Sequence, residues 1–174
     1  GLEMATNAVR MAALRSGQIV LVPGDTGYLL LASPIAPGAG AIALAGSPAT
    51  VVLATTANLL ETVPSLSLIG RKIARSLTPG PIVLHIQLSE AALAAARSDA
   101  SLSPGIADAH DALHVRIPGP SIASSLAHHM IRPLIAWEPA DASGRTLSDA
   151  DAALAAASKL GIVPSIALAD APPT

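Results

Sequence analysis

Short, largely apolar runs, most of them bounded on at least one side by proline or glycine, recur along this chain between segments with helical spacing. They lie at residues 18–22, 28–32, 50–54, 82–88, 113–117, 134–137 and 162–168. Because consecutive positions are apolar, both faces of the strands they form are expected to be buried, as in a sheet covered by helices. The pattern predicts an α/β fold. We expect a twisted open sheet with helices on both faces and one domain spanning residues 1–174.

Helical segments are predicted between these strands, from the spacing of apolar residues and from capping residues. They lie at residues 4–15, 40–45, 56–63, 66–77, 89–97, 121–130 and 148–159, with a polar loop at 99–111. Ser148 is the expected N-cap of the last helix. Arg71, Lys72 and Arg75 are expected to form a solvated face of the helix at 66–77.

The composition excludes several classes of protein. Hydrophobic residues make up 51% and charged residues 13% of the chain, which excludes intrinsic disorder and a coiled coil. The net charge of −2 provides no general attraction for nucleic acid or an anionic membrane. With no Phe, one Tyr and one Trp, stacking platforms for single-stranded nucleic acid are lacking. Without cysteine, no disulfide, thiolate nucleophile or Cys-based zinc site exists.

A membrane span and a leader sequence are both disfavoured. No charged residue lies between Asp25 and Glu61, but prolines and glycines divide this stretch into strand-length runs. The first residues show no basic segment followed by an apolar one, so no signal peptide is predicted. The lack of cysteine suits a reducing compartment, and we expect a cytoplasmic protein.

Two local motifs favour structural interpretations over functional ones. Gly38-Ala39-Gly40-Ala41-Ile42-Ala43 matches a dinucleotide fingerprint, but a proline-containing segment separates it from the preceding strand. The alternative is a small-residue helix packed close to the sheet. His110 and His114 have the spacing of metal ligands on a helix, yet His114 falls at the start of a predicted strand. No metal site is predicted.

Four segments carry a more informative pattern through their order along the chain. They are Pro23-Gly24-Asp25-Thr26-Gly27-Tyr28, Pro79-Gly80-Pro81, Arg116-Ile117-Pro118 and Ala140-Asp141-Ala142-Ser143-Gly144. The ordered set resembles the YrdC-like family of threonylcarbamoyl-adenylate synthases. That family shows P-T-D-T-x-Y-G-L, K-x-R, P-G-P-x-T, R-x-P and S-x-N-x-S-G in the same order, over nearly the whole chain.

The resemblance implies condensation of L-threonine, bicarbonate and ATP into threonylcarbamoyl-adenylate for the t6A modification of tRNA, with Mg²⁺ as a candidate cofactor. It implies a concave cleft with Thr26 and Arg116 as catalytic residues. Ser143, Asp141 and Pro81 would hold the nucleotide, and Thr26 and Tyr28 the threonine. Some family members bind double-stranded RNA in a basic cleft.

The chain departs from the family pattern where charge would be bound. Ala45 and Ser47 occupy the positions of the K-x-R cations, and no Lys or Arg lies between Arg15 and Arg71. Val83 replaces a threonine, and Asp141 brings a negative charge to the S-x-N segment. Either the protein is an enzyme of this type with a re-equipped site, or it is a catalytically impaired module that binds a small ligand or a protein partner. Weak or no binding of double-stranded RNA is expected.

Purely structural roles also remain open for the retained residues. Asp25 and Thr26 would then form a turn stabilised by the aspartate side chain. Arg116 would form a surface salt bridge at a strand end, and Ser143-Gly144 an ordinary loop.

Overall fold

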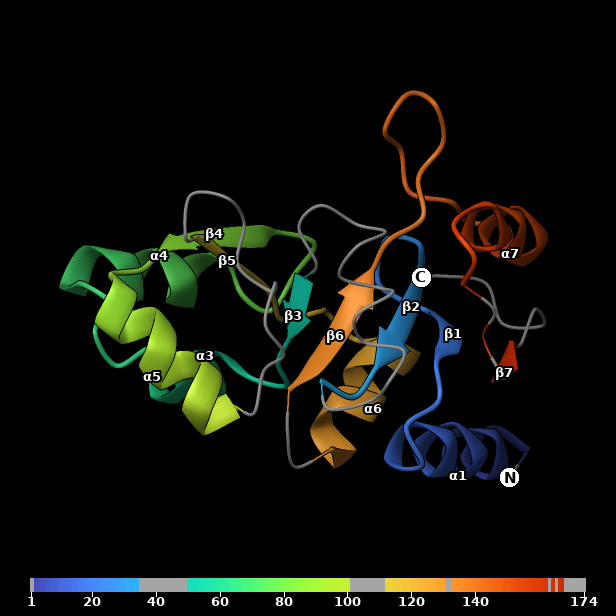
Figure 1. The fold of residues 1–174 in the computed structure, drawn as a ribbon, viewed down its shortest axis with the longest axis horizontal. Helices are drawn as coiled ribbons and strands as arrows, with labels where there is room; N and C mark the ends of the chain where they lie inside the picture. The colour runs from blue at the N-terminus through green and yellow to red at the C-terminus, as the bar shows by residue number, and fades with distance from the viewer. Residues whose placement is uncertain are drawn as a thin grey trace.

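The computed structural model describes residues 2–34, 50–100, 112–130 and 133–162, together with Pro164, Ile166 and Ala167. In this part of the chain, seven strands form one mixed sheet in the order β4-β5-β3-β6-β2-β1-β7 (Figure 1). The strands are β1 (Val20–Pro23), β2 (Tyr28–Ala32), β3 (Thr50–Val52), β4 (Val83–Gln87), β5 (Ala112–Arg116), β6 (Leu134–Trp137) and β7 (Ile166–Ala167). The predicted strands that begin at residues 18, 82, 113 and 134 all belong to this one sheet, which confirms the α/β fold.

The helices in the described residues cover both faces of this sheet. They are α1 (Leu2–Arg15), α3 (Thr56–Thr62), α4 (Leu68–Leu77), α5 (Glu90–Ala100), α6 (Ile122–His129) and α7 (Ala150–Lys159). Figure 1 shows α3, α4 and α5 grouped at the β4–β5 end of the sheet, while α1 and α6 lie together near β1 and β2.

Two apolar cores result from the alternation of side chains along each strand. Val20 and Val22 face α1 and α6, whereas Leu21 between them belongs to the core of the opposite face. That second core takes Leu59 from α3 and Leu93 from α5, together with alanines of α4 and α7. Successive residues of a strand point to opposite faces, so a continuous apolar run supplies both cores.

Several element boundaries differ from the sequence predictions. The expected N-cap Ser148 is wrong: Asp149 is the N-cap of α7, and its Oδ2 accepts a hydrogen bond from the N–H of Ala152 at 3.2 Å. Both residue types can cap a helix, and the capping side chain is the one that reaches an N–H three residues ahead.

β4 is the end strand of the described sheet and exposes Val83, His85 and Gln87, so it is not buried on both faces.

The charge-free stretch between Asp25 and Glu61 supplies β2, β3 and most of α3. Its predicted helix at residues 40–45 lies outside the described residues, as do positions 101–111 of the predicted polar loop. Residues 99 and 100 of that loop instead end α5. Among the helices of the described residues, none has both the length and the apolar character needed to cross a bilayer.

Candidate functional site

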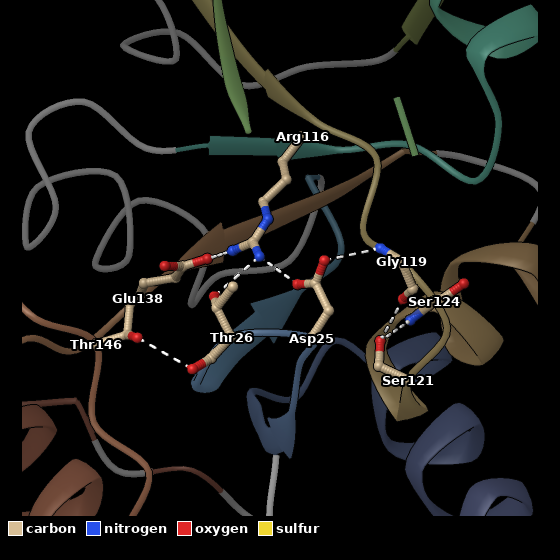
Figure 2. A network of polar contacts seen from close by, with 8 residues as sticks. All are labelled: Asp25, Thr26, Arg116, Gly119, Ser121, Ser124, Glu138 and Thr146. Atoms are coloured by element: carbon tan, nitrogen blue, oxygen red, sulfur yellow. Dashed lines mark hydrogen bonds and ion pairs between the residues drawn. The ribbon is translucent and has the colours of Figure 1, made fainter. Parts of the chain in front are cut away.

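Arg116, the last residue of β5, is the centre of a polar cluster formed by three separate segments (Figure 2). Its side chain is 2% exposed and forms ion pairs with Asp25 and Glu138. Its Nη2 also donates a hydrogen bond to Oγ1 of Thr26 at 3.0 Å. The guanidinium is thus held by the turn between β1 and β2 and by the residue that follows β6. Arg116 forms salt bridges at a strand end, as the structural alternative held, but its side chain is buried and does not lie at the surface.

The β1–β2 turn orients Asp25 and Thr26 toward the arginine. The N–H of Gly24 donates to the carbonyl of Gly27 at 2.8 Å, which closes the turn. Oδ2 of Asp25 accepts a hydrogen bond from the N–H of Gly119 at 2.8 Å, in the segment that leads from β5 to α6. Asp25 therefore connects its turn to the β5–α6 segment, rather than stabilising its own turn as the structural alternative proposed.

The cluster carries more negative than positive charge. One guanidinium faces two carboxylates, so formal charge is in excess by one negative unit. Burial lowers the pKa of the Arg116 guanidinium, and the nearby carboxylate of Asp25 acts in the opposite direction. Both terminal nitrogens of Arg116 are engaged, while its buried Nε has no hydrogen-bond acceptor among the described residues. The two terminal nitrogens are therefore engaged by side chains of the protein itself, and the Nε–H is left without an acceptor in the described part of the chain.

The β6–α7 segment is hydrogen-bonded to backbone groups of Thr26 and Tyr28 at the same turn. Oγ1 of Thr146 donates to the carbonyl of Thr26 at 3.1 Å, and the N–H of Tyr28 donates to the carbonyl of Leu147 at 2.9 Å. A Cβ added at Gly27 would lie 2.6 Å from Cβ of Thr146, so this close approach requires glycine. The contacts fix the position of Thr26 relative to the β6–α7 segment.

Asp141 and Ser143 lie together in an exposed hairpin between Ala140 and Thr146. Oδ1 of Asp141 accepts hydrogen bonds from Oγ of Ser143 at 2.6 Å, from its N–H at 2.9 Å and from the N–H of Arg145 at 3.0 Å. The Ser143 hydroxyl and the Arg145 N–H lower the pKa of the Asp141 carboxyl. The structure thus pairs Asp141 with Ser143, and pairs Thr26 with Arg116 in a different cluster.

Tyr28, Pro81 and His114, which the sequence also singled out, make none of the contacts of this cluster. The side chain of Tyr28 is 1% exposed within the apolar core, and Pro81 is exposed in the segment between α4 and β4. Ala45, Ser47 and the glycine motif at 38–43 lie outside the described residues. His114 lies in β5, as predicted, and its ring centroid is 3.8 Å from that of His85 on β4. The described residues contain no group of three side chains suited to hold a metal ion.

Glu138 is the site residue that sequence reasoning missed. It directly follows the predicted strand at 134–137, and it is the one acidic residue between Asp111 and Asp141. The signal that would have identified Glu138 is its position: it is an acidic residue at a strand end, close in sequence to the segment 140–144 that was expected to contact a ligand. The family pattern gave it no role, so its position opposite Arg116 became apparent only in the structure.

Comparison with solved structures places this fold among known proteins, although no family model and no curated protein sequence matches the chain. P. abyssi Sua5 in complex with L-threonine has a TM-score of 0.72 at 18% identity, over 96% of this chain and 47% of Sua5. E. coli YciO has a TM-score of 0.70 at 15% identity, over 94% of this chain and 76% of YciO. Full-length HypF, in a phosphate- and nucleotide-bound form, has a TM-score of 0.66 at 19% identity, over 96% of this chain and 25% of HypF. The chain spans about half the length of Sua5, and its fold is that of Sua5 and YciO, as its resemblance to the YrdC-like family predicted.

Proposed function

We propose that this protein is a threonylcarbamoyl-adenylate synthase-like domain that binds a small ligand near Arg116 but lacks efficient ATP-dependent catalysis. The observation that carries the proposal is the double engagement of Arg116 by Asp25 and Glu138. An arginine intended for phosphate or carboxylate must offer its paired N–H groups to the ligand. Here those groups are occupied by two side chains of the protein itself.

The chemistry of the family explains why this loss matters. Adenylation develops negative charge around the α-phosphate, and positive side chains normally stabilise that charge. The two cations of K-x-R are replaced by Ala45 and Ser47, and the cluster around Arg116 has an excess of negative charge. Removal of a single charge-stabilising donor lowers the rate by about a hundred- to thousandfold in comparable enzymes. Several such losses leave catalysis near background.

The charge of the cluster favours a small zwitterion or cation over a nucleotide as ligand. Asp25 and Glu138 attract an ammonium group and repel a triphosphate. Thr26 is exposed and offers a hydroxyl beside the guanidinium. L-Threonine, the ligand of the Sua5 complex, combines an ammonium, a carboxylate and a hydroxyl. We therefore infer that the amino-acid half of the family's site is better preserved here than the nucleotide half.

Pyrophosphate release in the presence of ATP, Mg²⁺, L-threonine and bicarbonate tests the catalytic part of this proposal. We expect a rate indistinguishable from that of a control without protein. Turnover at an ordinary enzymatic rate would show that the site is active and that the proposal is wrong.

Calorimetric titration tests the ligand part. We expect L-threonine to bind more tightly than ATP, and more tightly than 3-hydroxybutyrate, which lacks the ammonium group. Glu138→Gln removes one carboxylate and should raise the affinity for ATP about fivefold, which corresponds to one charge interaction of about 1 kcal/mol. Preferential binding of ATP by the wild-type protein would contradict the inference.

A further inference from the structure

Exposed apolar side chains are concentrated at one end of the molecule, on α4 and the beginning of β4. Eight large apolar side chains are more than a third exposed in the described residues, and six of them lie here. The six, which define the α4–β4 surface, are Leu68, Ile69, Ile73, Leu77, Ile82 and Val83. Leu68 and Ile69 are 81% and 72% exposed. Clustered apolar exposure of this kind marks an interaction site.

The α4–β4 surface has the shape of a ridge beside a groove. Ile69, Ile73 and Leu77 are four residues apart and form a ridge about 12 Å long on one side of the helix. Only Ala74 of α4 is buried, so the helix packs on the protein with a narrow edge. Between α4 and the end strand β4 lies a cavity of about 200 Å³, lined by Gly70 and Ile73 on one wall and by Leu84 and Ile86 on the other. Figure 1 shows this end of the sheet to be remote from α1 and α7.

The charge of this surface is opposite to that of the whole chain. Residues 62–89 contain three cations, Arg71, Lys72 and Arg75, and no Asp or Glu, although the protein carries a net charge of −2. Arg71 donates to the carbonyls of Leu66 and Pro64, and so helps to hold the segment before α4. Lys72 and Arg75 are exposed and form no ion pair with the described residues. They are available to a negatively charged partner.

These features distinguish between the possible occupants. A second copy joined by two-fold symmetry would bring the cations of both copies into one interface, where residues 62–89 supply no carboxylate to pair with them. RNA offers no partner for a ridge of isoleucine and leucine that carries no aromatic residue. A bilayer surface is broad and does not enter a groove between a helix and a sheet edge. A helix with an apolar stripe and acidic flanks can place apolar side chains in the groove and carboxylates beside the cations.

We propose that the α4–β4 surface binds an acidic amphipathic helix of a partner protein. Apolar side chains spaced at three and four residues along that helix pack against Ile73 and into the groove. Carboxylates beside them pair with Lys72 and Arg75. Val83, at one edge of this surface, pairs with Arg116 across β4 and β5, whereas Ile73, Lys72 and Arg75 lie on α4.

Fluorescence anisotropy with two designed peptides tests this proposal. Both peptides carry leucines at helical spacing, one with glutamates and the other with lysines at the remaining positions. We expect the acidic peptide to bind at least about tenfold more tightly, because interface charges of the wrong sign are strongly unfavourable. Ile73→Glu should reduce its affinity at least about tenfold, as for a central apolar contact. Lys72→Glu should reduce the affinity and its dependence on salt.

Val9→Glu is the matched control, because Val9 is a 54% exposed apolar residue on α1 and should leave binding unchanged. Circular dichroism of each variant checks that the fold is retained. Equal binding of the two peptides, no binding of the acidic one, or an unchanged affinity of Ile73→Glu would overturn the proposal. Three other occupants are tested in parallel: phosphatidylserine vesicles, double-stranded RNA and, by sedimentation, a second copy of the protein. If any of them binds, if Ile73→Glu abolishes that binding, and if the acidic peptide does not compete with it, the proposal is also overturned.

Discussion

Arg116 and Asp25 form a buried ion pair although 91 residues separate them along the chain. The second oxygen of Asp25 accepts the N–H of Gly119, three residues beyond the arginine. One carboxylate thus connects the β1–β2 turn both to the end of β5 and to the segment that enters α6. Glu138 approaches the same guanidinium from the end of β6, so the cluster joins β5 and β6 to the β1–β2 turn.

Asp25→Asn should destabilise the protein by about 3 kcal/mol. Removal of one partner of a buried ion pair typically costs about 3–5 kcal/mol, and Glu138 remains as a second partner for Arg116, which favours the lower value. Urea denaturation measures the change in the free energy of unfolding. Glu61→Gln, at an exposed position on α3, is the control and should change stability by less than about 0.5 kcal/mol. An equally small effect of Asp25→Asn would show that the ion pair does not hold the turn.

Gly27→Ala should destabilise the protein by about 1–3 kcal/mol, as overpacking does in tightly packed sites. The added methyl group would lie 2.6 Å from Cβ of Thr146 and 3.0 Å from the carbonyl of Leu147, so the turn and the β6–α7 segment must separate. Thermal unfolding measures the effect. Gly119→Ala is a matched control in the same cluster, because its methyl group would meet Asp25 at an ordinary contact distance of 3.4 Å. A loss of stability from Gly119→Ala as large as that from Gly27→Ala would contradict this account.

Ser143→Ala should raise the pKa of Asp141 toward its ordinary value. The Ser143 hydroxyl is the first cause of the lowered pKa, followed by the N–H of Arg145. A carboxyl with a lowered pKa stabilises the folded hairpin above its unfolded-state pKa, and this contribution is lost as the pH falls through the folded-state pKa. NMR titration of the Asp141 carboxyl carbon in both proteins measures the shift. Identical titration curves would mean that the hydroxyl does not stabilise the charged form in solution.

Double-stranded RNA should bind weakly or not at all near physiological ionic strength. The chain has 10 Lys and Arg against 12 Asp and Glu, and the arginine of the cluster is paired with two carboxylates. RNA affinity depends on the number of phosphates neutralised, and it falls steeply with salt when several are. A gel-shift titration between low and physiological salt tests this expectation. Tight, strongly salt-dependent binding would show that a basic surface of the protein neutralises several phosphates, and would contradict the expectation.

Local sequence signals were sufficient to predict the strands and the layers of the fold. Proline and glycine end the apolar runs by restricting or freeing the backbone, and the length of each run distinguishes a strand from a helix. The order of the turn motifs likewise predicted the fold shared with Sua5 and YciO. It also singled out Thr26 and Arg116, which the structure brings together. Ser143 and Asp141 came from the same resemblance, and they form their own exposed hairpin instead.

The sequence by itself determined, within a few residues, where most of the described helices and strands begin and end, because those limits depend on local backbone preferences and on periodicity. Only the tertiary structure decided which charges meet. No local pattern places Glu138 opposite Arg116, since that contact depends on how β5 and β6 are arranged within the sheet. The same holds for α4, whose amphipathic sequence would suit burial. Its ridge stays exposed because the helix lies beside β4, the end strand of the described sheet, where no further strand of that sheet covers it.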